Sequence, residues 1–269
     1  MKTALKGENR FEKDARRYAD YLQTAEGRLR AELTFANLQE FLRPRMGVNP
    51  LCVLDLGCGP GGAGIRLAQL GMKVTLFDSS PAMLDLAKKA MSDAGVSDGI
   101  TLKRGEAAQL TEVIPAKSFD VILCHNVLEY VDSPSQVLSV AVRLLRDASS
   151  TLSVLVRNQA GEVLKAAVQA GDLEAAEQNL DAEWVTESLY GGKARLFTPN
   201  TLQSKLQAAS LRISARRGVR VASDYLPADI SRSTNYERIF SLERKLGMRE
   251  EFFGVARYLH CLCSPAVRS

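Results

Sequence analysis

Short apolar runs alternate with amphipathic stretches along the chain from residue 51 onward. Five of these runs are rich in Val, Ile and Leu and are too continuous for strands with one solvent-facing side. They span residues 51–57, 73–78, 100–105, 119–126 and 151–158. Strands buried on both faces are typical of a parallel sheet that helices cover on each side. The pattern therefore predicts an α/β core.

The stretches between these runs have helical periodicity and recognisable ends. They span residues 62–71, 80–95 and 133–147. Two of them open on Ser-Pro, at 80–81 and 133–134, which places an N-cap residue before a proline at the first helical position. Gly71 and Gly95 stand where the first two would end. Strands alternating with such helices predict a doubly wound sheet.

The flanking segments extend this core into a single domain, residues 1–269. Residues 1–48 predict an N-terminal helical arm, with a helical pattern over 8–42, and residues 49–158 form the core. The acidic, Ala-rich start of residues 159–197 predicts a helical insertion. In residues 198–269 we expect a helix over 198–210, alternating strands over 211–226 and 254–264, and a helix over 233–248 between them. These last two strands predict an antiparallel sheet edge.

The first crossover carries a glycine-rich loop within VLDLGCGPGG, residues 53–62. Gly57, Gly59 and Gly62 match GxGxxG, and Asp78 follows at the end of the second strand, as in dinucleotide-binding domains. A tight strand-to-helix turn with no ligand would also need glycines. Asp55, however, would repel a bound diphosphate by roughly a few kcal/mol. S-adenosylmethionine has no phosphate and carries two cationic groups. Its ribose diol could donate hydrogen bonds to the Asp78 carboxylate.

The loop and its surroundings resemble the class I S-adenosylmethionine-dependent methyltransferases. The resemblance covers about residues 50–158: the run from Asp55 to Gly61, Asp78, the residues 106–108 after the third strand, and HNVLEYV after the fourth. It implies a seven-stranded, mostly parallel sheet whose last strand is antiparallel. Outside this core, EGRLRAEL, GVRVASDYL and ARYLHC are similar to a bacterial branch that methylates wobble 5-carboxymethoxyuridine in tRNA to its methyl ester.

The resemblance also implies roles for individual residues. Arg30 would meet the cofactor's carboxylate, Gly57 and Cys58 its methionine backbone, Asp78 the ribose, Ala107 and Ala108 the adenine region, and His125 the methionine side. The full set expected at the cofactor is Arg30, Asp55, Gly57, Cys58, Gly59, Asp78, Ser79, Ala107, Ala108 and His125. For the substrate we expect Arg157 and Arg220 near an acceptor carboxylate, with Tyr225 nearby. Arg30 could instead be a solvated helix residue and His125 a core histidine.

Charge and composition bear on three further questions: RNA binding, metal binding and the location of the protein. The net charge is +4, but residues 191–269 hold 14 Lys and Arg against 6 Asp and Glu. This basic region could bind RNA phosphates, with Tyr225, Tyr236 and Tyr258 for stacking, or it could be an ordinary solvated surface. Two histidines and five cysteines without a CxxC pair argue against a metal site. No apolar run reaches membrane-spanning length and residues 1–21 lack a hydrophobic stretch, so we expect a cytoplasmic protein.

Several functions are compatible with these features. The first is a tRNA methyltransferase acting on a carboxylate, which is ionised at neutral pH and needs no general base. A second is a small-molecule methyltransferase acting on a quinone precursor or a carboxylic acid, with the insertion and N-terminal helix as a lid. A module that binds the cofactor without catalysis and a dinucleotide oxidoreductase are further alternatives.

Overall fold

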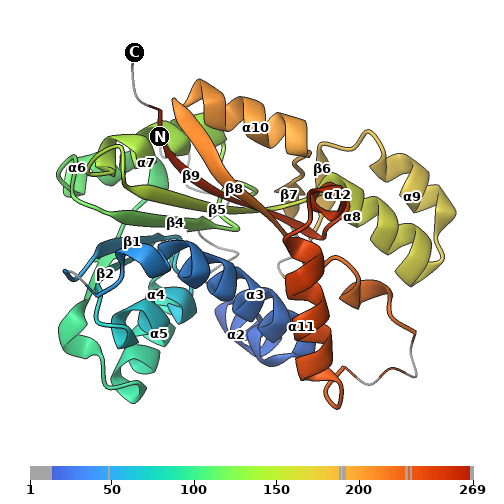
Figure 1. Cartoon of the computed structure of the whole chain (residues 1–269), viewed down its shortest axis with the longest axis horizontal. Helices are drawn as coiled ribbons and strands as arrows, with labels where there is room; N and C mark the ends of the chain where they lie inside the picture. The colour runs from blue at the N-terminus through green and yellow to red at the C-terminus, as the bar shows by residue number, and fades with distance from the viewer. Residues whose placement is uncertain are drawn as a thin grey trace, which may run out of the picture.

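A seven-stranded sheet forms the centre of the computed structural model, which describes residues 14–47, 49–187, 189, 192–227, 230 and 232–266 (Figure 1). The strands follow the order β3-β2-β1-β4-β5-β9-β8. Their bounds are β1 Cys52–Leu56, β2 Lys73–Asp78, β3 Ile100–Arg104, β4 Val121–His125, β5 Thr151–Arg157, β8 Leu211–Val219 and β9 Tyr258–Pro265. β1 to β5 are parallel, whereas β9 runs antiparallel to both β5 and β8. The predicted fold class, including its antiparallel last strand, is confirmed.

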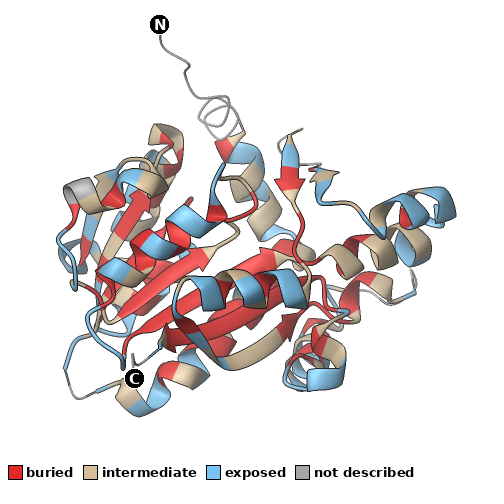
Figure 2. Ribbon diagram, turned by 90° about the horizontal axis from the view of Figure 1, so that it is seen from above, coloured by how far each residue is buried: buried red, intermediate tan, exposed pale blue. Residues whose placement is uncertain are grey.

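Helices cover both faces of the sheet, and each face has its own apolar cluster. One cluster joins the strands to α6 (Leu110–Val113), α7 (Pro134–Leu144) and α10 (Pro199–Ala208). The other joins them to α3 (Ala25–Leu42), α4 (Gly62–Gln69) and α5 (Pro81–Asp93). A third cluster packs α11 (Tyr236–Gly247) and α3 against residues of β5, β8 and β9. Figure 2 shows the central strands buried between helices whose outer faces are exposed, whereas the edge strands β3 and β8 are only partly buried.

The helix ends are those that the Ser-Pro and glycine signals predict. Ser80 Oγ accepts the Met83 amide at 3.3 Å, and Ser133 Oγ accepts the Gln136 amide at 3.3 Å. Each serine precedes a proline at the start of its helix. Such caps satisfy amide groups that have no partner within the helix.

The N-terminal arm is two helices instead of one. α2 (Ala15–Gln23) ends where Thr24 turns extended and caps α3 by accepting the Gly27 amide at 3.1 Å. Gly27 lets the two helices meet, since a Cβ there would lie 2.0 Å from the Tyr21 carbonyl oxygen. The start of the predicted helical stretch, residues 8–13, lies outside the described residues.

The insertion is only partly helical. α8 (Gln159–Leu164) continues into a π-helical segment (Lys165–Ala170), and α9 (Leu173–Asn179) follows. The second half forms an antiparallel hairpin of β6 (Trp184–Thr186) and β7 (Lys193–Arg195), which the sequence pattern did not predict. Strands of three residues are too short to show a period-two pattern.

The expected strand over 211–226 is also shorter than predicted, because β8 ends at Val219 and Arg220 has a positive φ of 60°. The remaining short elements are α12 (Glu250–Phe253) and the 3₁₀ turns Arg43–Arg45, Ser97–Gly99, Ala107–Gln109 and Ser223–Tyr225.

Candidate active site

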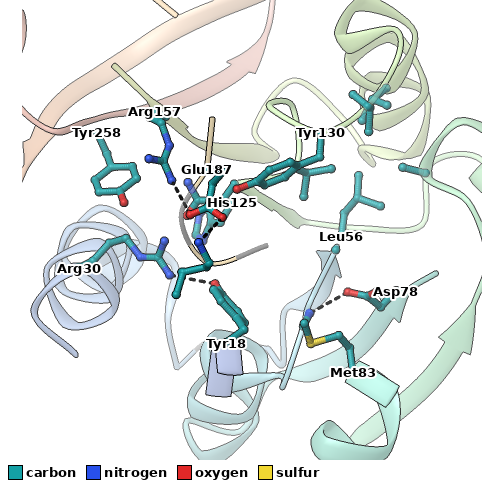
Figure 3. Close-up of a pocket in the computed structure, with 18 of the residues that line it drawn as sticks. Tyr18, Arg30, Leu56, Asp78, Met83, His125, Tyr130, Arg157, Glu187 and Tyr258 are labelled. Carbon is teal, nitrogen blue, oxygen red and sulfur yellow. Dashed lines mark hydrogen bonds and ion pairs between the residues drawn. The ribbon is translucent and has the colours of Figure 1, made fainter. Parts of the chain in front are cut away.

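A cavity of about 1180 Å³ opens at the carboxyl ends of the parallel strands. The chain segments around it are far apart in sequence: α2 and α3, the loops after β1 to β5, the insertion, and the two ends of the connection between β8 and β9. Ligands of open parallel sheets bind at this edge. Figure 3 shows that Arg30, Arg157 and Tyr258 gather on one side, while Asp78 and Met83 lie on the other. The cavity therefore has a basic end and an end at β2.

The glycine loop approaches the cavity through backbone. Gly57 and Gly59 line it and have positive φ angles of 67° and 53°, which residues with a side chain rarely adopt. A Cβ on Gly57 would lie 2.5 Å from Val127 Cγ2, another residue of the lining. The loop is thus shaped to leave room beside its main chain.

Asp78 and its neighbours form the end of the cavity at β2. Asp78 Oδ2 accepts the Gly59 amide at 2.9 Å and Oδ1 accepts the Ser80 amide at 3.0 Å. Burial raises the pKa of this carboxyl above its ordinary value, and the hydrogen bonds from backbone amides offset only part of this rise. A carboxylate has further lone pairs that can accept hydroxyl groups of a ligand. Ser79, Ala107 and Ala108 line the same cavity.

Two expected cofactor residues, Asp55 and Cys58, are not among the residues that line the cavity. Asp55 is buried, and its Oδ2 accepts the Gly64 amide at 3.0 Å at the start of α4. Burial raises its pKa to about 7. Burial also raises the pKa of the Cys58 thiol, which donates to the Gly59 carbonyl at 3.4 Å. The Asp55 carboxylate therefore braces the start of α4 behind the glycine loop, whereas the electrostatic argument assumed that it faces the ligand.

Arg30 is a buried cation held among tyrosine rings at the basic end. Its Nη2 donates to the Tyr18 hydroxyl at 2.9 Å, and its Cζ lies 5.7, 5.2 and 5.5 Å from the ring centroids of Tyr18, Tyr21 and Tyr258. Arg30 is only 6% exposed, and no carboxylate among the described residues pairs with it. A solvated helix arginine, the alternative reading, is excluded. The position suits a negatively charged group of a ligand.

Arg157, Arg220 and Arg257 join Arg30 around the buried Tyr258. Burial raises the pKa of Tyr258, but the four guanidinium groups outweigh it and bring the pKa to about 7. Three of the arginines are neutralised by neighbouring carboxylates. Arg157 pairs with Glu162 at 2.8 Å and with Glu187 at 3.5 Å, Arg257 pairs with Glu162 and Asp224, and Arg220 pairs with Asp224.

The expected substrate residues are therefore only partly brought together. Arg157 and Arg220 both line the cavity. Arg220 is held in its positive-φ conformation while its Nη1 donates to the Tyr21 hydroxyl at 3.2 Å. Tyr225 is not part of the lining, and its hydroxyl lies 3.5 Å from the Gly161 carbonyl oxygen.

His125 ends β4 and lines the cavity. Its Nε2 lies 2.8 Å from Ser153 Oγ, which lies 2.8 Å from His260 Nε2 on the far side. Burial, and then the charge of Arg30, lower the pKa of His125 to about 3. His125 is thus a neutral residue at the ligand edge of the sheet and no simple core histidine.

Sequence reasoning missed several residues of the lining. They are Tyr18, Tyr21, Tyr130, Glu187, Arg257 and, as a cavity residue, Tyr258. Tyr18, Tyr21 and Glu187 lie in the arm and the insertion, where no motif marks them, whereas Tyr130 belongs to HNVLEYV and Arg257 and Tyr258 to ARYLHC. Asn126, which follows His125 in HNVLEYV, also lines the cavity. It adopts a positive φ of 54°, and such conformations are concentrated at functional sites.

Several arginines of the basic C-terminal region are buried or paired with carboxylates. Arg220 and Arg257 are buried at the cavity, and Arg216, Arg232, Arg244 and Arg249 pair with Glu250, Glu26, Glu40 and Glu251. Tyr236 and Tyr258 are buried and are not exposed for stacking. The basic region therefore gives little support of its own to RNA binding.

The described part of the chain holds no cluster of three or more His, Cys, Asp or Glu side chains that could bind a metal ion. Within the same residues, none of the helices combines the length and apolarity that crossing a membrane requires.

The chain is similar to known proteins as a member of a domain family, in its sequence and in its fold. The methyltransferase domain family matches residues 49–209. The tRNA 5-carboxymethoxyuridine methyltransferase of Escherichia coli strain K12 is 30% identical over 243 residues, covering 88% of each protein. The ubiquinone biosynthesis O-methyltransferase of Pseudomonas paraeruginosa is 34% identical over 115 residues, 42% of this chain and 48% of that protein. Magnesium protoporphyrin IX methyltransferase from Synechocystis PCC 6803, solved with bound SAH, shares the fold with a TM-score of 0.65 at 14% identity, over 96% and 98% of the two chains.

Proposed function

Because this chain belongs to the S-adenosylmethionine-dependent methyltransferases, we propose that it methylates the carboxylate of 5-carboxymethoxyuridine at the wobble position of tRNA. The proposal carries over the acceptor of the Escherichia coli relative, which matches nearly the whole chain. It also places the protein in the cytoplasm, where tRNA is modified. The observation that carries it here is the basic end of the cavity, where four arginines surround Tyr258.

The residues at the cavity fit the cofactor. Gly57 and Gly59 leave a backbone cradle that a Cβ would fill, Asp78 presents a carboxylate for the ribose diol, and Arg30 is a buried cation without a carboxylate partner among the described residues. We therefore assign Arg30, the glycine loop and His125 to the methionine part, and Asp78, Ser79, Ala107 and Ala108 to the nucleoside. Asp55 and Cys58 would act on the cofactor only through the loop that they support.

The cavity is large enough for more than the cofactor. Small-molecule sites typically measure roughly 300–1,000 Å³, and this cavity measures about 1180 Å³. Beyond the expected methionine part lie Arg157, Arg220 and Tyr130, with Glu187 and Leu189 from the insertion. This region would receive the acceptor base.

Methyl transfer to a carboxylate requires little of the protein beyond positioning the acceptor against the cofactor. S-adenosylmethionine, when bound, supplies an electrophilic methyl group on a sulfonium. A carboxylate with a pKa near ~4 is already ionised at neutral pH, so no side chain has to remove a proton. Arg157 and Arg220 would orient the acceptor carboxylate. Because each is already paired with a protein carboxylate, neither would bind the acceptor so tightly as to suppress its nucleophilicity.

The test is methyl transfer from radiolabelled S-adenosylmethionine by the purified protein. The expected acceptor is tRNA that carries 5-carboxymethoxyuridine, and the label should leave as methanol under mild alkali, as methyl esters do. Transfer that is equal on tRNA with unmodified uridine at that position, or a label stable to alkali, would reject the proposal. In cells lacking the gene, the free acid should accumulate in tRNA nucleosides in place of its methyl ester.

A small-molecule acceptor is the second candidate, favoured by the similarity of the core to the ubiquinone-pathway enzyme. A quinone precursor methylated on a phenol differs from the tRNA carboxylate in the charge of the acceptor. A neutral phenol would leave Arg157 and Arg220 without a function, so that Arg220→Ala would barely change its KM. For a carboxylate acceptor, the same variant should raise the acceptor KM far more than the KM for the cofactor.

A further inference from the structure

A chain of three polar side chains, one partly buried and two fully buried, runs across three neighbouring strands of the sheet. His125 on β4, Ser153 on β5 and His260 on β9 are linked through Ser153 Oγ, which lies 2.8 Å from the Nε2 atom of each histidine. The two rings are 5.5 Å apart and perpendicular, at 86°. Ser153 and His260 have no exposed surface. Polar groups in such a place are retained only when their hydrogen bonds compensate for the lost hydration.

Both histidines are neutral in this environment. Burial, then the neighbouring His125 and Arg217, lower the pKa of His260 well below its usual value, and the pKa of His125 is likewise low. Each ring therefore carries one proton, on either Nδ1 or Nε2.

The single hydrogen of Ser153 couples these two choices. If Ser153 donates to His125 Nε2, it must accept from an Nε2–H of His260, and His125 then carries its proton on Nδ1. If Ser153 donates to His260 Nε2 instead, it accepts from His125, and His260 carries its proton on Nδ1. The two arrangements differ in which ring presents an Nδ1–H.

His260 Nδ1 decides between the arrangements. This atom is buried and has no hydrogen-bond partner among the residues that the structure describes. A buried N–H without an acceptor is rarer in proteins than a buried acceptor without a donor. The arrangement that leaves only a lone pair on His260 Nδ1 is therefore favoured. His125 lines the cavity, and since its Nε2 faces Ser153, its Nδ1–H is left for the cavity.

We infer that Ser153 and His260 are positioning residues that hold His125 as the Nδ1–H tautomer, so that it donates a hydrogen bond to a carboxylate oxygen bound in the cavity. An uncharged donor beside the buried Arg30 adds directionality to a site that already attracts negative charge. Two carboxylates could meet it: the amino-acid carboxylate of the cofactor, or that of the acceptor. Only the second alternative rests on the proposed function.

Nuclear magnetic resonance tests the tautomers without any substitution. The chain has only two histidines, so a long-range ¹H–¹⁵N spectrum of the ¹⁵N-histidine-labelled protein contains two ring systems. We expect one ring protonated on Nδ1 and the other on Nε2, with His260→Phe removing the Nε2–H ring. A spectrum in which His125 carries its proton on Nε2, or is doubly protonated at pH 7, would overturn the inference.

Ser153→Ala tests the positioning role, with Ser264→Ala on β9 as the matched control. Losing one hydrogen bond to a charged carboxylate corresponds to a rise of about tenfold to a hundredfold in Kd. We expect Ser153→Ala to show this rise for S-adenosylhomocysteine, but not for 5′-methylthioadenosine, which has no carboxylate. Ser264→Ala should change neither.

The two sources of the carboxylate give different results. A rise in the S-adenosylhomocysteine Kd assigns the bond to the cofactor, whether or not tRNA is methylated. An unchanged cofactor Kd with a raised KM for 5-carboxymethoxyuridine tRNA assigns it to the acceptor. If Ser153→Ala alters neither constant while the protein remains folded, Ser153 has no positioning role and the inference fails.

Discussion

Gly57→Ala probes the glycine loop where its backbone lines the cavity. The substitution has two separable costs. A residue with a Cβ in the left-handed region loses roughly 1–2 kcal/mol, and Gly57 has a φ of 67°. The new Cβ would also lie 2.5 Å from Val127 Cγ2, and overpacking of this kind costs about 1–3 kcal/mol. We expect a total loss of about 2–5 kcal/mol in the free energy of unfolding.

Gly71→Ala is the matched control. Gly71 has a φ of 84°, but a Cβ there meets no atom within 4 Å. It should therefore lose only the backbone contribution, roughly 1–2 kcal/mol. The difference between the two variants in urea unfolding isolates the clash with Val127.

Ligand affinity separates a local from a general effect. Val127 and Gly57 both line the cavity, so displacement of the valine should raise the Kd for S-adenosylhomocysteine by about tenfold, or ~1.4 kcal/mol. Gly71→Ala should bind as the native protein does. Isothermal titration calorimetry that finds equal affinities for Gly57→Ala and the native protein, or equal losses in both variants, would refute the reasoning.

Three further substitutions test other parts of the site. Asp78→Asn should raise the S-adenosylhomocysteine Kd by about tenfold, because an amide cannot accept both backbone N–H groups and the diol, whereas the exposed Asp85→Asn should not. The pKa of Tyr258, about 7, lies below the unfolded value of ~10, so its contribution to stability grows as pH rises from 7 to 10 and is lost below 7. Tyr258→Phe should flatten this rise in urea unfolding at pH 6 to 9; an unchanged slope contradicts it. Glu243 accepts the amides of residues 221–223, so Glu243→Ala should cost about 2–4 kcal/mol and raise the acceptor KM through Arg220, leaving the cofactor Kd unchanged.

The sequence alone determined the architecture and the end of the cavity at β2. Hydrophobic periodicity and helix caps are local properties, so the alternation of strands and helices could be predicted from neighbouring residues. Gly57, Gly59 and Asp78 could be placed together because parallel strands bring their carboxyl ends to one edge. The short hairpin β6–β7 was missed because its strands carry too few residues for a periodic signal.

Only the tertiary structure decided the basic end of the cavity and the direction of individual side chains. Arg30 meets Tyr258 across more than two hundred residues of chain, and no local pattern encodes such a contact. Asp55 has the right position in the loop motif, yet its carboxylate turns to the Gly64 amide. The count of charged residues in the sequence does not show which of them form ion pairs. Arg216 and Arg244 belong to the region expected to bind RNA, yet folding pairs them with Glu250 and Glu40. Periodicity specifies which face of an element is buried, but the partners of a polar group are set by where distant elements pack.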